Sequence, residues 1–343
     1  ENERLEKVQE NNASGQDVSN EILSDLESMQ SSGWLVEAAV QDRLSWDAAV
    51  NAMTRRADEE RWLLHKHQVT VHQGMLLGEG GHGKVVKASF LGNPVALKLA
   101  RPDSTQQDGN ISTFQAAILN EIRLLRNLRH PNICRFYGIV RIASTTSSSA
   151  GIGLVTELVV GGDLREFVSD MLPRPTGKDK YQALVDISSA LVFLHESDLP
   201  VVHGDVKPSN IMVSRSMGGQ PTAKFIDFGL ARAREEFVQI LGGSIRWKAP
   251  EVQRGKRPRK ESDIFSFGYL AYFCFSEKYP WADNSADEIK QASKHSTAPI
   301  HDLENTRVLP LVQQMLQMEI VDRPKASLVH SQLMELMTRQ APL

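Results

Sequence analysis

The chain has 343 residues, of which 41% are apolar and 24% are charged, so it can bury the core of one large domain or two ordinary ones. Its 39 lysines and arginines against 42 acidic residues give a net charge of −3, which argues against a simple nucleic-acid-binding protein. Two cysteines are too few for a disulfide framework, and the longest mostly apolar stretch, 264–275, is shorter than the ~20 residues of a membrane span.

The cysteine count and the absence of a secretory signal favour a reducing, cytoplasmic environment with no membrane contact within this sequence. The first residue is Glu1 rather than Met. We therefore expect the chain to be part of a longer protein, with any targeting signal lying outside it.

Residues 1–20 are polar and lack a heptad pattern, which predicts a linker. Residues 21–70 are predicted to form a helical extension, because apolar side chains recur at three- and four-residue steps between Ile22 and Leu64, with a break at Ser32 and Gly33. Two interpretations of these helices stay open. They pack on the neighbouring domain, or they bind a partner or an upstream module.

After residue 70 the pattern changes to short β-rich runs punctuated by glycine. Strands are expected near 69–77, 84–91, 94–99, 134–140 and 153–160. One helix is expected at 114–128, and helices dominate from Asp163 onward. The order of elements predicts an α+β fold with a small β-rich part followed by a larger helical part.

Three glycines, Gly78, Gly80 and Gly83, lie between two predicted strands and are followed by Val85. Glycines at this spacing let backbone N–H groups approach phosphate oxygens, although the spacing alone is a weak signal. A dinucleotide-binding fold needs a helix after the third glycine, whereas here a strand continues. The pattern favours a different kind of nucleotide site.

Lys98 ends a β-rich run, and Glu121 lies within the predicted helix that follows it. A lysine at such a place is usually a surface residue. An acid on the inner face of a helix needs a cation, however, and Lys98 could supply it while also contacting phosphates.

The segment 203–210 has the sequence His-Gly-Asp-Val-Lys-Pro-Ser-Asn, which is a specific pattern. Asp205 can accept a hydroxyl proton, Lys207 can steady a phosphate, and Asn210 can ligate Mg²⁺. A second oxygen ligand, Asp227, follows at a predicted strand end, and Ala-Pro-Glu closes the segment at 249–251.

Taken in order, these motifs resemble those of the protein kinase family, over about residues 72–338. The resemblance implies a two-lobed fold, with an N-lobe at about 72–156 and a C-lobe at about 163–338, that binds ATP and Mg²⁺ in the cleft between the lobes and phosphorylates proteins.

The resemblance also implies roles for single residues. Those expected to act in catalysis are Lys98, Glu121, Asp205 and Lys207, with Asp205 as the base. Those expected to hold the metal are Asn210 and Asp227. Those expected to bind the nucleotide are Leu77, Gly78, Gly80, Gly83, Val85, Ala96, Lys98, Glu157, Val159 and Met212.

Within the family, Lys207 is typical of serine/threonine kinases, whereas Arg246-Trp247 looks like the tyrosine kinases. This mixture resembles the tyrosine-kinase-like group, whose members mostly phosphorylate Ser and Thr. Gly204 stands where most members have an arginine that binds an activating phosphate, and Ser244 is the sole hydroxyl residue between Asp227 and Glu251. We therefore expect activity without phosphorylation of that segment.

The sequence leaves two alternative functions open. A small-molecule phosphotransferase is suggested by Gly204, because aminoglycoside and choline kinases have a similar His-Gly-Asp loop, but those enzymes generally lack the Ala-Pro-Glu segment. A catalytically weak scaffold of kinase fold is the other alternative, although Lys98, Asp205, Asn210 and Asp227 are all present.

Overall fold

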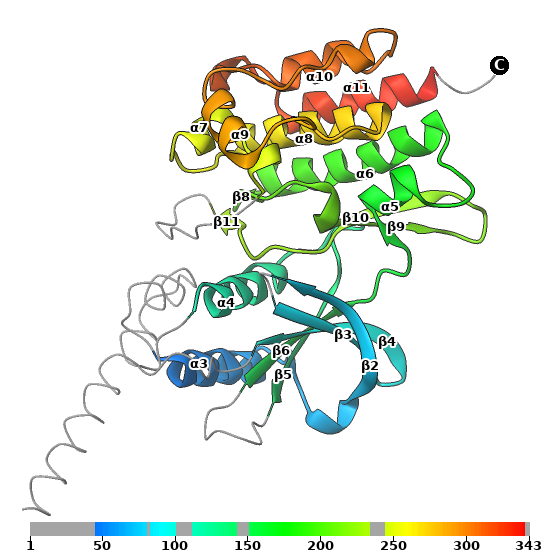
Figure 1. The fold of residues 1–343 in the computed structure, drawn as a ribbon. Coiled ribbons are helices and arrows are strands. Elements are labelled where there is room, and N and C mark those ends of the chain that lie inside the picture. Colours follow the sequence, from blue (N-terminus) through cyan, green and yellow to red (C-terminus); the bar gives the residue numbers. More distant parts are fainter. Residues whose placement is uncertain (1–44, 81–82, 101–111, 143–150, 234–243, 340–343) are drawn as a thin grey trace, which may run out of the picture.

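The structure is a computed structural model that describes residues 45–80, 83–100, 112–142, 151–233 and 244–339. These residues form a small lobe built on a β-sheet and a larger lobe built mainly from helices, joined at residues 158–161 (Figure 1). The predicted α+β, two-lobed fold is confirmed. The predicted linker at 1–20 and the helices expected before residue 45 lie outside the described residues.

The N-lobe is a six-stranded sheet in the order β1-β5-β6-β4-β3-β2. Its strands are β1 (Leu63–Leu64), β2 (Val69–Gly80), β3 (Gly83–Phe90), β4 (Asn93–Ala100), β5 (Phe136–Ile142) and β6 (Gly151–Glu157). All neighbours pair antiparallel except β1, which runs parallel to β5. Leu91 and Gly92 both have positive φ, which suits the two-residue turn between β3 and β4.

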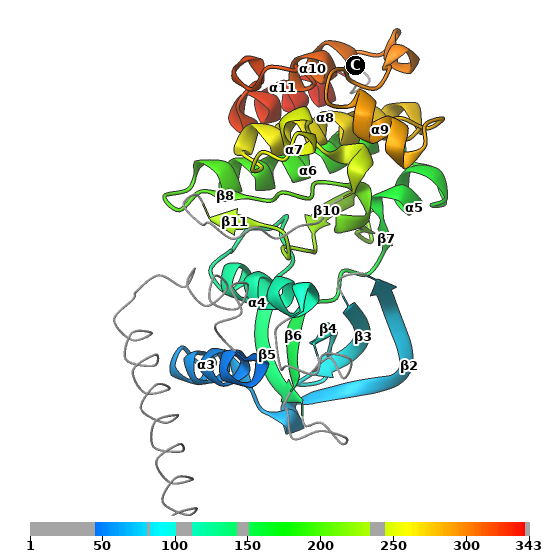
Figure 2. The same cartoon turned by 60° about the vertical axis from the view of Figure 1, so that its left-hand side comes forward.

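Two helices pack on this sheet. In α3 (Trp46–Glu59), Ser45 caps the N-terminus, and residues spaced three or four apart are buried. The helix α4 (Thr113–Leu125) begins with a capping box between Ser112 and Gln115. The buried apolar residues of α3 and most of those of α4 belong to one core cluster, and both views show α3 beside β5 and near α4 (Figure 2).

The helical extension predicted for 21–70 differs from the structure at its end. Helix α3 stops at Glu59, and Leu63–Leu64 form strand β1, followed by the short 3-10 helix η1 (Lys66–Gln68) and the start of β2. The two leucines pair with Ile139 and Val140 of β5. The strand therefore owes its conformation to a distant partner, which local helical spacing does not reveal.

The C-lobe is organised around α8 (Lys260–Ser276), in which every residue from Ser262 to Cys274 is buried. The other helices are α5 (Leu164–Ser169), α6 (Gly177–Glu196), α7 (Pro250–Gln253), α9 (Ala286–Ala292), α10 (Leu309–Met315) and α11 (Ala326–Thr338). Short 3-10 helices are η2 (Pro208–Asn210), η3 (Ile245–Trp247), η4 (His301–Leu303) and η5 (Ile320–Asp322). None of the helices within the described ranges combines the length and apolarity needed to cross a bilayer.

Two small sheets lie where the C-lobe faces the N-lobe (Figure 1). One has the order β10-β9-β7, from β7 (Gly162–Asp163), β9 (Ile211–Arg215) and β10 (Pro221–Phe225). The other pairs β8 (Val201–Val202) with β11 (Arg232–Ala233). The loops after β8 and β10 carry the polar residues singled out by the sequence.

Candidate active site

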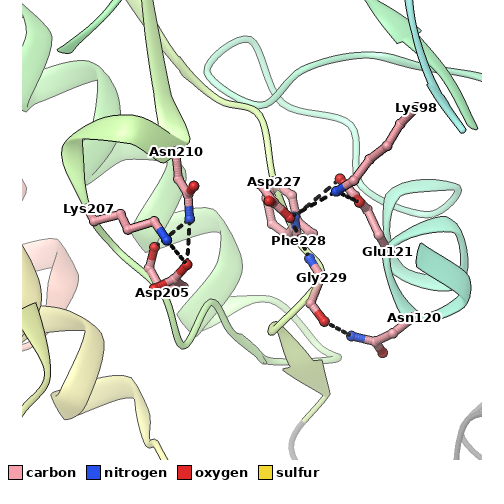
Figure 3. A network of polar contacts seen from close by, with 9 residues as sticks. All are labelled: Lys98, Asn120, Glu121, Asp205, Lys207, Asn210, Asp227, Phe228 and Gly229. Carbon is pink, nitrogen blue, oxygen red and sulfur yellow. Dashed lines mark hydrogen bonds and ion pairs between the residues drawn. The ribbon is translucent and has the colours of Figure 1, made fainter. Parts of the chain in front are cut away.

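Lys98 lies near the end of β4, on the opposite face from the buried Leu97, and meets carboxylates from two other elements. Its Nζ donates to Glu121 Oε2 at 2.6 Å and to Asp227 Oδ1 at 3.4 Å (Figure 3). The side chains of Lys98 and Glu121 are 12% and 1% exposed, so neither charge would be stable there without the other.

Burial alone lowers the pKa of Lys98, but the carboxylates of Glu121 and Asp227 outweigh burial and raise this pKa, which keeps the ammonium charged. Burial raises the pKa of Glu121, while Lys98 opposes the increase. The arrangement therefore places a permanent positive charge beside Asp227.

The turn Asp227-Phe228-Gly229 follows β10 and lies against α4. The backbone N–H of Phe228 donates to Glu121 Oε1 at 3.4 Å, and that of Gly229 donates to Asp227 Oδ1 at 2.9 Å. A Cβ on Gly229 would lie 3.2 Å from Asp227 Oδ1 and 3.4 Å from the Cβ of Ala117, so glycine permits this close approach.

The loop after β8 and the short helix η2 that follows it bring Asp205, Lys207 and Asn210 together (Figure 3). Lys207 Nζ lies 2.6 Å from Asp205 Oδ2, and Asn210 Nδ2 donates to Asp205 Oδ2 and to its backbone oxygen, both at 2.9 Å. The backbone N–H of Ser244 reaches Asp205 Oδ1 at 3.4 Å. The Asp205 carboxylate is thus fixed by neighbours on its own loop and by one residue far along the chain.

A buried carboxylate on α8, Asp263, holds the start of this loop. It accepts hydrogen bonds from the backbone N–H groups of His203 at 2.7 Å and Gly204 at 2.8 Å, and from His195 Nε2 at 2.8 Å. The ring of His203 packs 5.0 Å from that of Phe228, and burial lowers the pKa of His203. This ring contact links the loop that carries Asp205 to the turn that carries Asp227.

The family model described as the protein kinase domain matches residues 71–335. The chain belongs to the protein kinase family. It is 30% identical over 241 residues to "Serine/threonine-protein kinase VIK" of Arabidopsis thaliana, an alignment that covers 68% of this chain and 51% of the plant protein.

Other relatives are similar over shorter stretches. The chain is 32% identical over 212 residues to "Mitogen-activated protein kinase kinase kinase 11" of Rattus norvegicus, covering 60% of this chain and 24% of the rat protein. It is 32% identical over 198 residues to "Probable serine/threonine-protein kinase DDB_G0275165" of Dictyostelium discoideum, covering 57% of this chain and 20% of the Dictyostelium protein. The chain thus spans about half or less of the length of these curated relatives.

The kinase residues expected to bind the nucleotide lie on both sides of the junction between the lobes. Gly78 pairs with Val85, and Gly80 with Gly83, at the end of the β2-β3 hairpin, whose tip residues 81–82 lie outside the described part. Val85 pairs with Lys98 on β4, and Ala96 on β4 pairs with Thr156 on β6. Leu77 lies on β2 and Met212 on β9, in opposite lobes.

Glu157 ends β6, and Val159 follows it in the connection between the lobes. The Glu157 carboxylate accepts hydrogen bonds from Lys224 Nζ at 2.6 and 2.8 Å and from the backbone N–H of Arg135 at 3.1 Å. Lys224 is not indicated by the sequence, because a lysine on β10 carries no motif. Its ion pair with Glu157 links the end of β6 in the N-lobe to β10 in the C-lobe.

A buried ion pair in the C-lobe joins two segments that are far apart in the sequence. Arg323 donates to both carboxylate oxygens of Glu251, at 2.8 and 2.9 Å, and Ser262 Oγ donates to Glu251 Oε1 at 2.6 Å. All three residues are buried. This bidentate pair anchors α7, and with it the end of the segment that begins at Asp227.

Proposed function

We propose that this chain is an ATP-dependent protein kinase that transfers the γ-phosphate of Mg-ATP to serine or threonine hydroxyls, with Asp205 as the base. The observation that carries the proposal is the presence of two polar groups near the lobe junction. In one, Lys98 contacts Glu121 and Asp227; in the other, Asp205 contacts Lys207 and Asn210. The first group provides the charged ammonium of Lys98 and the carboxylate of Asp227. The second provides the carboxylate of Asp205, which contacts the ammonium of Lys207 and the amide of Asn210.

Asp205 would orient the acceptor hydroxyl and receive its proton. Lys207 and Asn210 contact Oδ2 at 2.6 and 2.9 Å, whereas the Ser244 N–H reaches Oδ1 at 3.4 Å, so Oδ1 is the oxygen better placed to accept a proton. Lys207 would also offset the charge of the transferred phosphate, and Lys98 would contact the phosphates nearer the nucleoside. Leu77, Val85, Ala96 and Met212 would enclose the adenine, and the backbone of Glu157 and Val159 would hydrogen-bond it. Gly78, Gly80 and Gly83 would cover the phosphates.

The oxygen donors of the site fit Mg²⁺. Both bonds of Asn210 to Asp205 use Nδ2, which leaves its Oδ1 as a ligand, and Asp227 supplies a carboxylate. No cluster of three or more His, Cys, Asp or Glu side chains suited to a metal occurs in the described ranges. One or two protein oxygens are enough for Mg²⁺, which otherwise binds waters and phosphates. When bound, Mg²⁺ neutralises charge on the phosphates.

Serine/threonine specificity rests on Lys207 and on the names of the relatives. The scaffold alternative is weaker, because it gives no reason for a buried Lys98-Glu121 pair next to Asp227. The small-molecule alternative gives no reason for the anchored segment ending at Glu251. We further propose that the kinase domain spans 72–338, that α3 belongs to a preceding extension, and that the protein works in the cytoplasm, with Cys134 and Cys274 both buried and unpaired.

The test is transfer of labelled γ-phosphate to a basic protein, followed by hydrolysis to phosphoamino acids, for the natural chain and for Asp227→Asn. Label on serine or threonine that disappears in the variant supports the proposal. Label on tyrosine contradicts the specificity inferred from Lys207. ATP binding without labelled protein would favour the scaffold, or the small-molecule alternative if added alcohols and amines become labelled.

A further inference from the structure

Asn120 directly precedes Glu121 on α4 and is 2% exposed, so its amide must find partners inside the protein. Its Nδ2 donates to the backbone oxygen of Gly229 at 3.2 Å and to that of Ala231 at 2.7 Å (Figure 3). Both acceptors belong to buried residues of the segment that follows Asp227. One side chain of α4 therefore binds this segment at two places.

The amide of Asn120 is itself held in one orientation. Arg123, one turn further along α4, donates from a guanidinium nitrogen to Asn120 Oδ1 at 2.8 Å. Because Oδ1 accepts this bond, Nδ2 must face the segment after Asp227. The Arg123 side chain is also buried, so the arrangement is shielded from water.

The contacts of Asn120 reach Asp227 through the turn. The N–H of Gly229 donates to Asp227 Oδ1, and the neighbouring Glu121 accepts the N–H of Phe228. Two adjacent residues of α4 thus hold successive positions of the turn. Without the Asn120 amide, two buried backbone oxygens would lose a donor, which would favour opening of the turn.

We propose that Asn120 is a positioning residue, which fixes the turn at 227–231 against α4 and so holds the Asp227 carboxylate where it faces Lys98. This role rests on the proposed phosphotransfer for its effect on activity. Its effect on the turn does not depend on any activity. The hydrogen bonds of Asn120 couple α4 to the turn that carries Asp227, independently of the Lys98-Glu121 ion pair.

Two variants and one control test the proposal. Asn120→Leu removes the amide at similar volume. Asn120→Asp keeps the shape and the oxygen that accepts from Arg123 but removes both donors. Ser188→Ala is the control, because Ser188 is also buried but hydrogen-bonds Val185 of its own helix and His330 of α11 rather than the turn. The Ser188→Ala substitution should lower the stability of the protein without changing the hydrogen bonds of the turn at 227–231.

The first readout is hydrogen exchange of the backbone amides of 228–233 without nucleotide. We expect both Asn120 variants to exchange there roughly tenfold to a hundredfold faster than the natural chain, whereas Ser188→Ala does not. The second readout is kinetic. We expect kcat to fall by a similar factor while the KM for ATP changes less than about threefold, because the adenine-binding residues are untouched.

Unchanged exchange at 228–233 in folded Asn120→Asp would overturn the proposal. So would a loss of kcat no greater than that of Ser188→Ala at equal thermal stability. Failure of Asn120→Asp to fold would also overturn it, by making Asn120 a folding residue. If the natural chain transfers no phosphate, the proposed function fails, and the exchange measurement alone then decides the role of Asn120.

Discussion

Replacing Gly204 by alanine adds a single methyl group and tests the backbone geometry of the loop that carries Asp205. Its φ is +74°, in the left-handed region, and a Cβ there would lie 3.0 Å from the backbone oxygen of Leu230. Gly219 has nearly the same φ, +78°, in the turn between β9 and β10, but an added Cβ would meet nothing within 4 Å. Gly219→Ala is therefore a matched control for Gly204→Ala.

The left-handed backbone costs an alanine about 1–2 kcal/mol, and the lower entropy of the unfolded chain offsets about 0.4–1 kcal/mol of this. Gly219→Ala should thus lower the free energy of unfolding by roughly 1 kcal/mol. In Gly204→Ala the contact with Leu230 adds overpacking, typically about 1–3 kcal/mol, for a total of roughly 2–4 kcal/mol.

The assay is urea unfolding followed by circular dichroism, with the midpoint and slope compared among the natural chain and both variants. Because Gly204 also donates to Asp263 at 2.8 Å and directly precedes Asp205, we expect kcat to fall by up to about a hundredfold in Gly204→Ala. Gly219→Ala should retain full activity. Equal loss of stability in the two variants would refute the reasoning, since it would mean that the Leu230 contact has no cost.

Two further outcomes are expected. Met53→Ala, which removes a buried side chain of α3, should lower the free energy of unfolding by about 2–5 kcal/mol; a loss below about 0.5 kcal/mol would show that α3 does not pack on the lobe. Burial alone raises the pKa of Glu251, but hydrogen bonds from Arg323 and Ser262 outweigh it and lower this pKa below the ordinary 4.5. The stabilisation from this lowered pKa is therefore present above about pH 4.5 and is lost as the pH falls through the pKa of Glu251 in the folded state. In urea titrations, the stability that Glu251→Gln loses relative to the natural chain should therefore shrink between about pH 7 and pH 3.5. A difference that stays constant over this range would contradict the prediction.

Much of the fold was predictable, because its elements follow local patterns. The alternating strands around Lys98 and the apolar stretch within α8 each have a period or composition typical of one structure. The groups at the lobe junction were predictable from motif spacing and from the resemblance to kinases. The position of Glu121 on the inner face of the predicted helix indicated that it needs a cation such as Lys98, and the resemblance implied the same pair.

The features that were missed depend on partners far away in the sequence. Leu63–Leu64 form a strand because they pair with β5, and no local pattern in the sequence indicates this pairing. Lys224 and Asn120 carry no motif, and their importance appears once Glu157 and Gly229 are brought beside them. A polar residue next to Glu121 on the inner face of an amphipathic helix was the one available signal for Asn120.

The most direct test of the central claim is the initial rate of γ-phosphate transfer to protein by the natural chain, by Asp205→Asn, and by Asp198→Asn as an exposed carboxylate control. We expect Asp205→Asn to lose about 10²–10⁴-fold in kcat, with ATP binding retained, while Asp198→Asn matches the natural chain. Transfer by Asp205→Asn at an undiminished rate would contradict the account, because it would show that this carboxylate does not act on the acceptor hydroxyl.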